Sequence, residues 1–338
     1  MRVLVLKEFG TMAVEERPDP RPGEGEALLR IAATGICGSD LHGFTGTNGR
    51  RVPGQVMGHE TGGRVAALGP GVTGLSEGDP ATVNPVLSCG RCAACRAGRE
   101  NHCPDKRVLG VDPSLSAAFG EYVIVPAGNV VPLPEGLPVE LGALVEPLAV
   151  GFHAAGRGGV REGDGVLVIG GGPIGQSAVL AARRAGAARV LVSEPDPGRA
   201  ALCERLGATP LSPDEPLDAQ VAGHLGGPAD VALDAVGASA TIAGALAATR
   251  LGGMVVLVGM AAPRVELPAY AVSTEERSLV GSFSYSAAEF ADAAAWAGDS
   301  PSLLAGLVER RVSLAEAPAE FTAMAAGRGG AGKVLVLL

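Results

Sequence analysis

The hydrophobic and polar positions of the chain follow two different periods, and the change between them falls near residue 150. In the first part, short apolar stretches alternate with clusters of Gly, Pro, Asp and Asn, which is the pattern of strands separated by turns. This spacing predicts an all-β barrel or sandwich. The predicted strands lie at 2–9, 25–36, 62–71, 78–85 and 120–126.

After Gly151 the pattern alternates between buried strands and helices. Elements of this length in this order predict a parallel sheet that is covered by helices on both faces. We expect strands at 165–171, 188–195, 229–237 and 253–260, and helices at 174–187, 197–208 and 239–249. The last segment, GKVLVLL at 332–338, is again a strand, which either extends this sheet or returns to the first part. A chain of 338 residues fits two such domains.

Composition and charge exclude several classes of protein. The chain has 27 basic and 36 acidic residues, a net charge of −9, so we expect neither a nucleic-acid partner nor an anionic membrane surface. It has no apolar run of the roughly 18 residues that a membrane-spanning helix requires. The apolar run in the first residues is too short for a signal peptide. We therefore expect a cytoplasmic protein.

Four of the six cysteines lie in one short polar stretch, CGRCAACRAGRENHC at 89–103. Disulfides are not expected in a reducing compartment. A zinc ion held by four thiolates would order a loop that has few apolar side chains to fold around. The alternatives are a loop without metal and an iron–sulfur cluster. Four protein ligands leave no open coordination position, so a zinc ion held by Cys89, Cys92, Cys95 and Cys103 would be structural.

A second set of possible ligands is scattered along the chain. Cys37 lies in GICGSDLHG, His59 and Glu60 lie in MGHETGG, and Glu146 lies in LVEPLAVG. Taken singly, such a cysteine is usually a core residue and such a His-Glu pair is usually on the surface. Together they offer a thiolate, an imidazole and carboxylates, and three protein ligands plus water form a catalytic zinc site. Asp40 would orient His59 through its other ring nitrogen, or is simply a turn residue.

A glycine-rich turn lies between the first predicted strand and helix of the second part. Its pattern, Gly170-x-Gly172-x-x-Gly175, predicts a dinucleotide whose pyrophosphate lies at the helix N-terminus. Glu194 ends the next predicted strand, where a carboxylate accepts hydrogen bonds from the adenosine ribose and repels a 2′-phosphate. This favours NAD over NADP. Arg199 would soften that preference, or is a surface charge.

Together these stretches resemble the zinc-dependent medium-chain dehydrogenases of the alcohol dehydrogenase superfamily, in the polyol, 2,3-butanediol and threonine dehydrogenase branch. The resemblance covers the whole chain, through GICGSDLH, GHE, CGRCAACRAGRENHC, EPLAV, GGGPIG and GKVLVLL. It implies an α/β protein with a GroES-like β-rich catalytic domain at 1–150 and 284–338, including a structural zinc lobe at 88–104. It also implies a Rossmann domain, a doubly wound parallel sheet, at 151–283. It further implies a homo-oligomer, either a dimer or a tetramer, with the tetramer favoured.

The same resemblance implies roles for individual residues. Cys37, His59 and Glu60 would bind a catalytic zinc, and the four clustered cysteines a structural one, giving two per chain. Glu146 would bind the catalytic zinc directly or through water, or relay a proton, and which glutamate is a ligand at rest stays open. Ser39 and His42 would carry the alcohol proton away. The implied cofactor contacts are Gly170, Gly172, Pro173, Ile174, Gly175, Glu194, Arg199, Val258, Gly259, Met260, Ser282, Phe283 and Ser284.

The implied reaction is the oxidation of a secondary alcohol to a ketone by NAD, with a vicinal diol, polyol or cyclitol as substrate. The stretch 190–199 is most similar to butanediol dehydrogenases. Two departures argue against a hexitol: Gly43 replaces the aromatic residue of sorbitol-type enzymes, leaving space near the metal, and Ser284 replaces their arginine. The alternatives are a threonine 3-dehydrogenase and a biosynthetic cyclitol or aminosugar dehydrogenase. A non-enzymatic nucleotide sensor or zinc-ribbon interaction protein is a further alternative, but it would need no open metal site.

Overall fold

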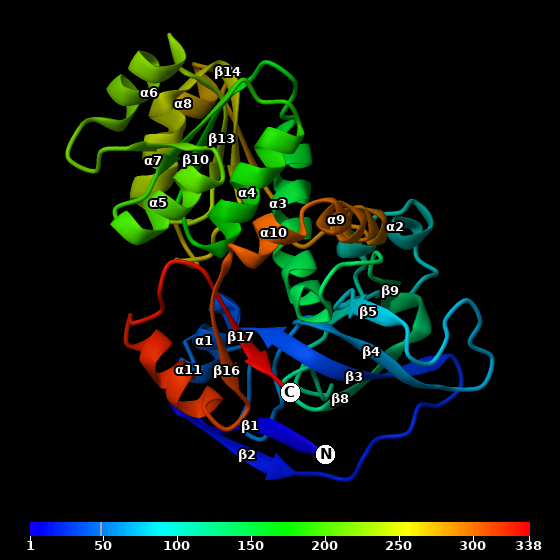
Figure 1. The fold of residues 1–338 in the computed structure, drawn as a ribbon. Coiled ribbons are helices and arrows are strands. Elements are labelled where there is room, and N and C mark those ends of the chain that lie inside the picture. The colour runs from blue at the N-terminus through cyan, green and yellow to red at the C-terminus, as the bar shows by residue number, and fades with distance from the viewer. Residues whose placement is uncertain (48) are drawn as a thin grey trace. The chain divides into compact units, whose positions relative to one another are not determined.

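The computed structural model describes residues 1–47 and 49–338, which form two compact units (Figure 1). The first unit combines Met1–Glu146 with Ser286–Leu338, and the second is Pro147–Tyr285. The predicted fold class, an α/β protein with a β-rich part and a parallel-sheet part, is confirmed. Among the helices that are described, none is long and apolar enough to cross a bilayer.

The first unit is built on a seven-stranded sheet. In order across it lie β16 (Val308–Ser313), β17 (Lys333–Leu337), β3 (Glu26–Gly35), β4 (Glu60–Leu68), β5 (Pro80–Val83) and β9 (Val130–Pro132), while β8 (Tyr122–Pro126) also pairs with β3. Two small sheets pair β1 (Arg2–Glu8) with β2 (Thr11–Glu16), and β6 (Val86–Leu87) with β7 (Arg107–Val108). The final strand β17 pairs antiparallel with β3, so the segment 332–338 returns to the first unit.

Short helices complete the first unit. They are α1 (Gly38–Thr45), α2 (Ala93–Arg96), α9 (Ala287–Asp299), α10 (Pro301–Ala305) and α11 (Ala317–Ala325), with 3-10 turns at Glu100–His102, Ala127–Asn129 and Val139–Leu144. An apolar cluster fixes α1, because Phe44 packs against Phe321 of α11 with ring centroids 5.7 Å apart. Phe119 meets the same ring edge-on at 5.5 Å. This packing matters for function because α1 carries several of the predicted site residues.

The second unit is a six-stranded parallel sheet with helices packed on it (Figure 1). The strands lie in the order β12 (Thr209–Leu211), β11 (Arg189–Ser193), β10 (Gly165–Ile169), β13 (Ala229–Asp234), β14 (Thr249–Leu257) and β15 (Ser278–Gly281). The helices are α4 (Pro173–Arg184), α5 (Pro197–Arg205), α6 (Leu217–Leu225), α7 (Ser239–Ala248) and α8 (Ala269–Ser273), and α3 (Val145–Gly158) begins at the end of the first unit. Numbered along the chain, this strand order is 3-2-1-4-5-6, that of the dinucleotide-binding Rossmann fold.

Candidate metal and cofactor sites

The possible metal ligands that are far apart in the sequence lie where the ends of β3, β4 and β17 meet in the first unit. Strand β3 runs antiparallel to both β4 and β17, so its carboxyl end lies beside the amino ends of the other two. In this register Gly35 of β3 is opposite Glu60 on one side and Leu335 on the other. Cys37 follows β3, while Glu60 and Lys333 begin β4 and β17. The topology thus brings these residues to one point although they are far apart in the sequence.

Cys37, His59 and Glu60 form a compact group of possible metal ligands. One ligand atom from each residue lies within 4.8 Å of the others. His59 and Glu60 are buried, and Cys37 is half-buried. A thiolate, an imidazole and a carboxylate at this separation match the donors of a three-ligand zinc site with one open position.

The two carboxylate oxygens of Glu60 have different surroundings. Oε1 accepts a hydrogen bond of 2.8 Å from Nζ of Lys333, in an ion pair whose side chains are 0% and 4% exposed. Oε2 is buried and has no hydrogen-bond partner among the described residues. Gly35 leaves the room that this oxygen occupies, because a Cβ at Gly35 would overlap Oε2. A buried oxygen without a donor is costly, and a metal ion on it would satisfy it, so these residues fit a zinc ion.

Asp40, in the first turn of α1, contacts two of the three possible ligands. Its Oδ2 accepts the backbone N–H of Cys37 at 3.1 Å, and its Oδ1 lies 3.6 Å from Nδ1 of His59. Nε2 of His59 is therefore the nitrogen left for a metal. Burial raises the pKa of the Asp40 carboxyl. Burial lowers the pKa of His59, but the negative charges of Asp40 and Cys37 outweigh it and raise the pKa to about 10. The site therefore attracts a positive charge, either a proton or a metal ion.

Glu146, in the first turn of α3, lies near this group without belonging to it. The group of close ligand atoms contains Glu60 and not Glu146. Burial lowers the pKa values of His59 and Lys333, but nearby negative charges outweigh it and raise both pKa values. Asp40 and Cys37 act on His59, Glu60 and Cys37 act on Lys333, and Glu146 adds to both effects. The geometry therefore favours Glu60 over Glu146 as the carboxylate ligand at rest.

The expectation that Gly43 leaves space near the metal is wrong. A Cβ at Gly43 would overlap Cγ of Arg51 and lie 3.2 Å from Sδ of Met57. The room left by the missing aromatic side chain is therefore filled by the stem of Arg51, which is almost fully buried. Sequence reasoning missed Arg51, because no motif marks it.

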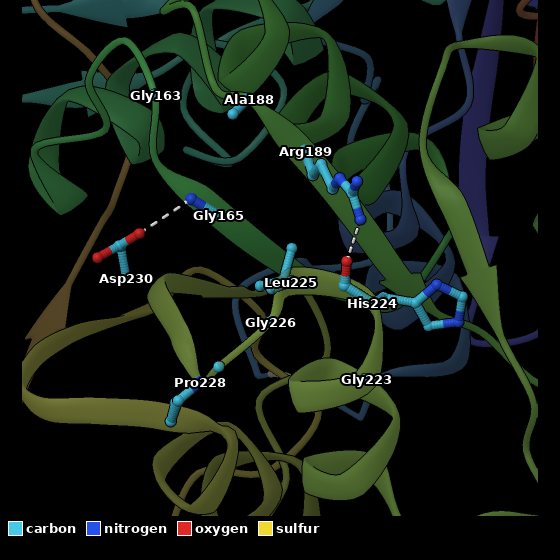
Figure 2. A pocket seen from close by; sticks show the side chains of 11 residues that line it. Gly163, Gly165, Ala188, Arg189, Gly223, His224, Leu225, Gly226, Pro228 and Asp230 are labelled. Carbon is cyan, nitrogen blue, oxygen red and sulfur yellow. Dashed lines mark hydrogen bonds between the residues drawn. The ribbon is translucent and has the colours of Figure 1, made fainter.

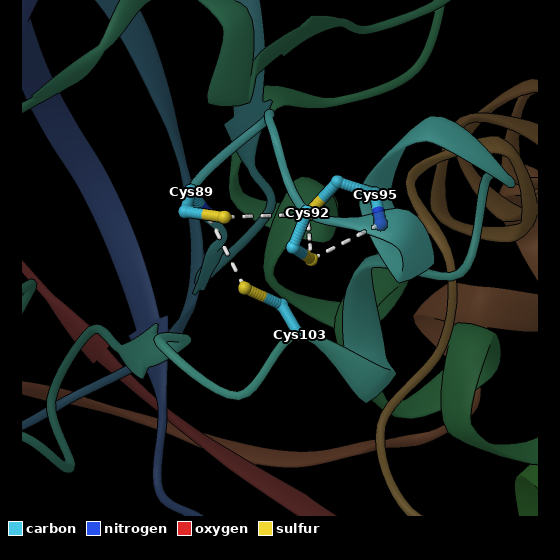
Figure 3. Close-up of side chains that lie close together, drawn as sticks. All are labelled: Cys89, Cys92, Cys95 and Cys103. Carbon is cyan, nitrogen blue, oxygen red and sulfur yellow. Dashed lines mark hydrogen bonds between the residues drawn. The ribbon is translucent and has the colours of Figure 1, made fainter.

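The four clustered cysteines point toward one another, as Figure 3 shows. The sulfurs of Cys92 and Cys95 lie 3.5 Å apart, and those of Cys89 and Cys95 lie 4.0 Å apart. Four sulfurs at about 2.3 Å from one zinc ion would be about 3.8 Å apart, which these distances match. The backbone N–H groups of Arg91 and Cys92 lower the pKa of Cys89 to about 6, and all six cysteines of the chain are free. The backbone N–H of Cys89 lowers the pKa of Cys103, but burial and the neighbouring thiols of Cys89 and Cys95 outweigh it and raise the pKa to about 11. The cluster thus supplies the four sulfur ligands of a closed zinc site, with Cys89 the more acidic of these two thiols.

The glycine turn of the second unit is shaped by close backbone contacts. Gly170 has a positive φ of 91°, and a Cβ at Gly175 would overlap the carbonyl oxygen of Gly170. Gly172 is the N-cap of α4, and a Cβ there would meet nothing within 4 Å. Open space in front of a helix N-terminus, lined by backbone N–H groups, is the form of a pyrophosphate site.

Glu194 is buried beside this turn. Its Oε2 accepts the N–H of Gly171 at 2.6 Å, and its Oε1 accepts the N–H of Asp196 at 2.8 Å. Each carboxylate oxygen has two lone pairs, so both can still accept a ribose hydroxyl. The carboxyl oxygen of Asp196 caps α5 by accepting the N–H of Arg199, whose side chain is half-buried.

The remaining predicted cofactor residues follow β14 and β15. Val258, Gly259 and Met260 come directly after β14, and residues 282–284 come after β15, so all lie at the carboxyl edge of the parallel sheet. Asp234, which sequence reasoning missed, organises this edge. Its Oδ1 accepts the N–H of Val236 and Gly237, its Oδ2 accepts the hydroxyl of Thr241, and its carbonyl accepts the N–H of Val258. The only indication of Asp234 in the sequence is an acidic residue at the end of an apolar predicted strand.

A separate hollow lies at the opposite, amino edge of the same sheet (Figure 2). Gly165 and Arg189, the first residues of β10 and β11, line it together with the turn 223–228. Asp230 accepts the N–H of Gly165 at 2.9 Å, and Arg189 donates to the carbonyl of His224. Its lining contains none of the predicted site residues, and its polar groups bond to one another.

Two family models match parts of this chain. The model of the alcohol dehydrogenase GroES-like domain matches residues 23–135, and that of the zinc-binding dehydrogenase domain matches residues 173–299. Sorbitol dehydrogenase of Bacillus subtilis (strain 168) is 34% identical over 294 residues, which cover 84% of this chain and 82% of the relative. L-threonine 3-dehydrogenase of Pyrococcus abyssi is 36% identical over 256 residues, which cover 73% and 72%.

A solved structure of a zinc-binding dehydrogenase from Sinorhizobium meliloti 1021, bound to NADP, has a TM-score of 0.89 and 32% identity, covering 100% of this chain and 99% of that one. The chain belongs to the zinc-dependent medium-chain alcohol dehydrogenase family, a class of oxidoreductases that act on CH–OH groups. The family resemblance read from the sequence motifs is thereby confirmed.

Proposed function

We propose that this protein is a zinc-dependent dehydrogenase that oxidises the secondary alcohol of a vicinal diol, polyol or cyclitol to a ketone, with NAD as hydride acceptor. The observation that carries the proposal is the group of Cys37, His59 and Glu60, in which Oε2 of Glu60 is buried without a partner. A zinc ion bound there would act as a Lewis acid that stabilises negative charge developing on the alcohol oxygen. A protein that only binds nucleotides needs no such group.

Helix α1 supplies a path for the alcohol proton. Ser39 is half-buried, and His42, three residues further along the helix, is exposed. Residues three apart lie on one face of a helix, so the two side chains could carry a proton from the interior to solvent. In this proposal the Ser39 hydroxyl takes the proton of the alcohol as it passes its own proton on toward the cofactor ribose, and His42 releases a proton to solvent, while Asp40 holds His59 in place.

The second unit is proposed to be the cofactor domain and the first the catalytic domain. The pyrophosphate would lie at the N-terminus of α4, above Gly170, Gly172, Pro173, Ile174 and Gly175. The ribose would bond to Glu194, and the carboxyl ends of β14 and β15 would hold the nicotinamide. We favour NAD because a 2′-phosphate would meet the negative charge of Glu194. The Sinorhizobium relative was solved with NADP, so the preference of this chain is a point to measure.

The four-cysteine cluster is proposed to hold a second, structural zinc ion. We further propose a homo-oligomer, with a tetramer favoured over a dimer, in the cytoplasm, where six free cysteines would stay reduced. Support for an oligomer comes from the edge strand β15 and from large apolar side chains exposed in the segments near it, those of Leu251, Leu267 and Tyr270. Light scattering on a sizing column measures the assembly directly.

The test is NAD reduction, followed by absorbance, on a panel of alcohols. The panel contains butanediol stereoisomers, sorbitol and shorter polyols, inositols, amino sugars and threonine, each with and without a zinc chelator. The proposal expects chelator-sensitive turnover of one diol, polyol or cyclitol. Threonine is the second candidate because of the Pyrococcus abyssi relative, and turnover of threonine alone would replace the proposal. If metal analysis of the same sample found one zinc ion per chain instead of two, the proposed catalytic zinc site would be wrong.

A further inference from the structure

Arg51 is a guanidinium buried in the interior of the first unit, in the segment between α1 and β4. Its side chain is 1% exposed. A charged group out of contact with water requires an opposite charge, because burying it alone is very costly. The acid that faces it is Asp40, whose side chain is 0% exposed and whose Oδ1 lies 3.6 Å from Nη2 of Arg51.

The same oxygen of Asp40 lies 3.6 Å from Nδ1 of His59, so Oδ1 stands between an imidazole and a guanidinium. The other oxygen, Oδ2, holds the backbone N–H of Cys37. One carboxylate therefore contacts two proposed zinc ligands, and Arg51 is a cation that pairs with the same carboxylate. Oδ1 of Asp40, Nδ1 of His59, and Nε and Nη2 of Arg51 have no hydrogen-bond partner in the described part of the chain, so they are available to one another.

The charges of the site show why a second cation is needed. A bound zinc ion would hold Cys37 as a thiolate, which with Glu60 and Asp40 would bring three negative charges into one buried region, and Glu146 would add a fourth nearby. Lys333 pairs with Glu60, so among the described residues Arg51 is the fixed cation that pairs with Asp40. With Arg51 and Lys333 in place, the four negative charges are balanced by two fixed cations and one divalent metal ion.

The path of Arg51 to Asp40 depends on a glycine. The Arg51 stem passes over Gly43 of α1, where a Cβ would overlap its Cγ and come within 3.2 Å of its Cβ. Glycine in a helix interior is unfavourable compared with alanine, so its presence here calls for a steric reason. Gly43 and Arg51 thus form a matched pair.

We propose that Arg51 is a positioning residue of the zinc site: it enters through the space above Gly43 and holds Asp40 against His59. The inference rests on the zinc site proposed above. It assigns no contact between Arg51 and substrate. It does predict that the metal affinity of one site depends on a residue that binds no metal.

The test measures zinc affinity by competition with a chelator, in wild type, Arg51→Met and Arg51→Lys. The four-cysteine zinc is an internal reference in every sample. Arg51→Met should weaken the catalytic zinc by tenfold or more and leave the structural zinc unchanged, since loss of a group that orients a ligand typically costs about 10–100-fold in metal affinity. Arg51→Lys should recover part of the loss, because it restores the charge. The matched control is Arg50→Met, an exposed neighbour with the same change in charge, which should bind both zinc ions as wild type does.

A second pair of variants covers the case in which Arg51→Met does not fold. Gly43→Ala keeps Arg51 and every charge but displaces the Arg51 stem, so it should weaken the catalytic zinc. Its control is Gly38→Ala in the same helix, where a Cβ meets nothing within 4 Å, so that variant should bind zinc as wild type does. Equal zinc affinity in wild type and Arg51→Met, or in Gly43→Ala and Gly38→Ala, would overturn the inference. Failure of the proposed function looks different, because wild type itself would then hold only the four-cysteine zinc.

Discussion

Replacing Lys333 by methionine should destabilise the first unit strongly, and more so without zinc. The Lys333–Glu60 pair is buried on both sides, with a hydrogen bond of 2.8 Å. Removing one partner of such a pair costs about 3–5 kcal/mol, because the other charge stays buried and unpaired. For a unit of about 200 residues, each kcal/mol shifts the Tm by roughly 2–4 °C, so we expect a decrease of roughly 6–20 °C.

Differential scanning calorimetry measures this change in zinc-loaded and chelator-treated protein. The decrease should be larger in the chelator-treated protein, because a bound zinc ion supplies positive charge to the same carboxylate. The matched control is Arg2→Met, which breaks a pair with Glu121 of the same 2.8 Å length, but with side chains 55% and 26% exposed. Exposed pairs contribute about 0–1 kcal/mol, so the control should lower the Tm by only a few degrees.

The pH dependence gives an independent check on the same pair. Burial lowers the pKa of Lys333, but the charges of Glu60 and Cys37 outweigh it, so the pKa is raised above its ordinary value. Stability from a raised pKa is present in full below the unfolded value, about 10.4 for lysine, and is lost as the pH rises through the folded value. The Tm difference between wild type and Lys333→Met should therefore shrink only above about pH 10.4. A Tm decrease in chelator-treated Lys333→Met no larger than that of Arg2→Met would refute the reasoning.

Three further predictions concern other parts of the molecule. Cys92→Ser should remove one zinc ion per chain, seen by metal analysis, and leave the KM for NAD unchanged, whereas a changed KM would mean that the two sites are linked. Glu194→Ala should raise the KM for NAD roughly 10–150-fold, because about 1.5–3 kcal/mol of hydrogen bonding to a charged group is lost. It should also bring the rates with NADP and NAD closer together, and an unchanged ratio of these two rates would argue against a ribose contact. Gly35→Ala should lose the catalytic zinc, because the added Cβ overlaps Oε2 of Glu60. Gly38→Ala, whose Cβ meets nothing within 4 Å, should bind both zinc ions, and equal zinc content in the two variants would contradict the steric argument.

Features that depend on neighbouring residues could be predicted from the sequence. The cysteine spacing and the glycine turn are local, because each motif supplies its geometry within a few residues. The strands and helices of the Rossmann unit also have local periods, and their predicted bounds differ from the observed ones by a few residues. The largest difference is β14, predicted at 253–260 and observed at Thr249–Leu257, because the strand begins before a bulge in which Gly252 has a φ of 65°.

Features that depend on distant pairing could not be predicted from the sequence in this way. Lys333 and Glu60 are separated by 273 positions, and nothing near either residue indicates the other. Arg51 lies in a segment with no periodic pattern, and its importance emerges only when its stem is seen above Gly43. The error about space near the metal has the same origin: a missing side chain leaves room only if no other residue fills it.

The pairing of β17 with β3 has a consequence for the order in which the protein is made. The carboxyl end of β3 is completed only when residues 333–337 arrive, after the whole of the second unit has left the ribosome. At about 5–20 residues per second, the roughly 140 residues of the second unit take about 7–28 s to synthesise. During that interval the last residues of β3 present an unpaired edge, and Glu60 lacks the lysine that neutralises it. The newly made chain therefore passes through a stage in which the second unit can fold while the proposed metal site of the first unit is still open to premature association with other chains.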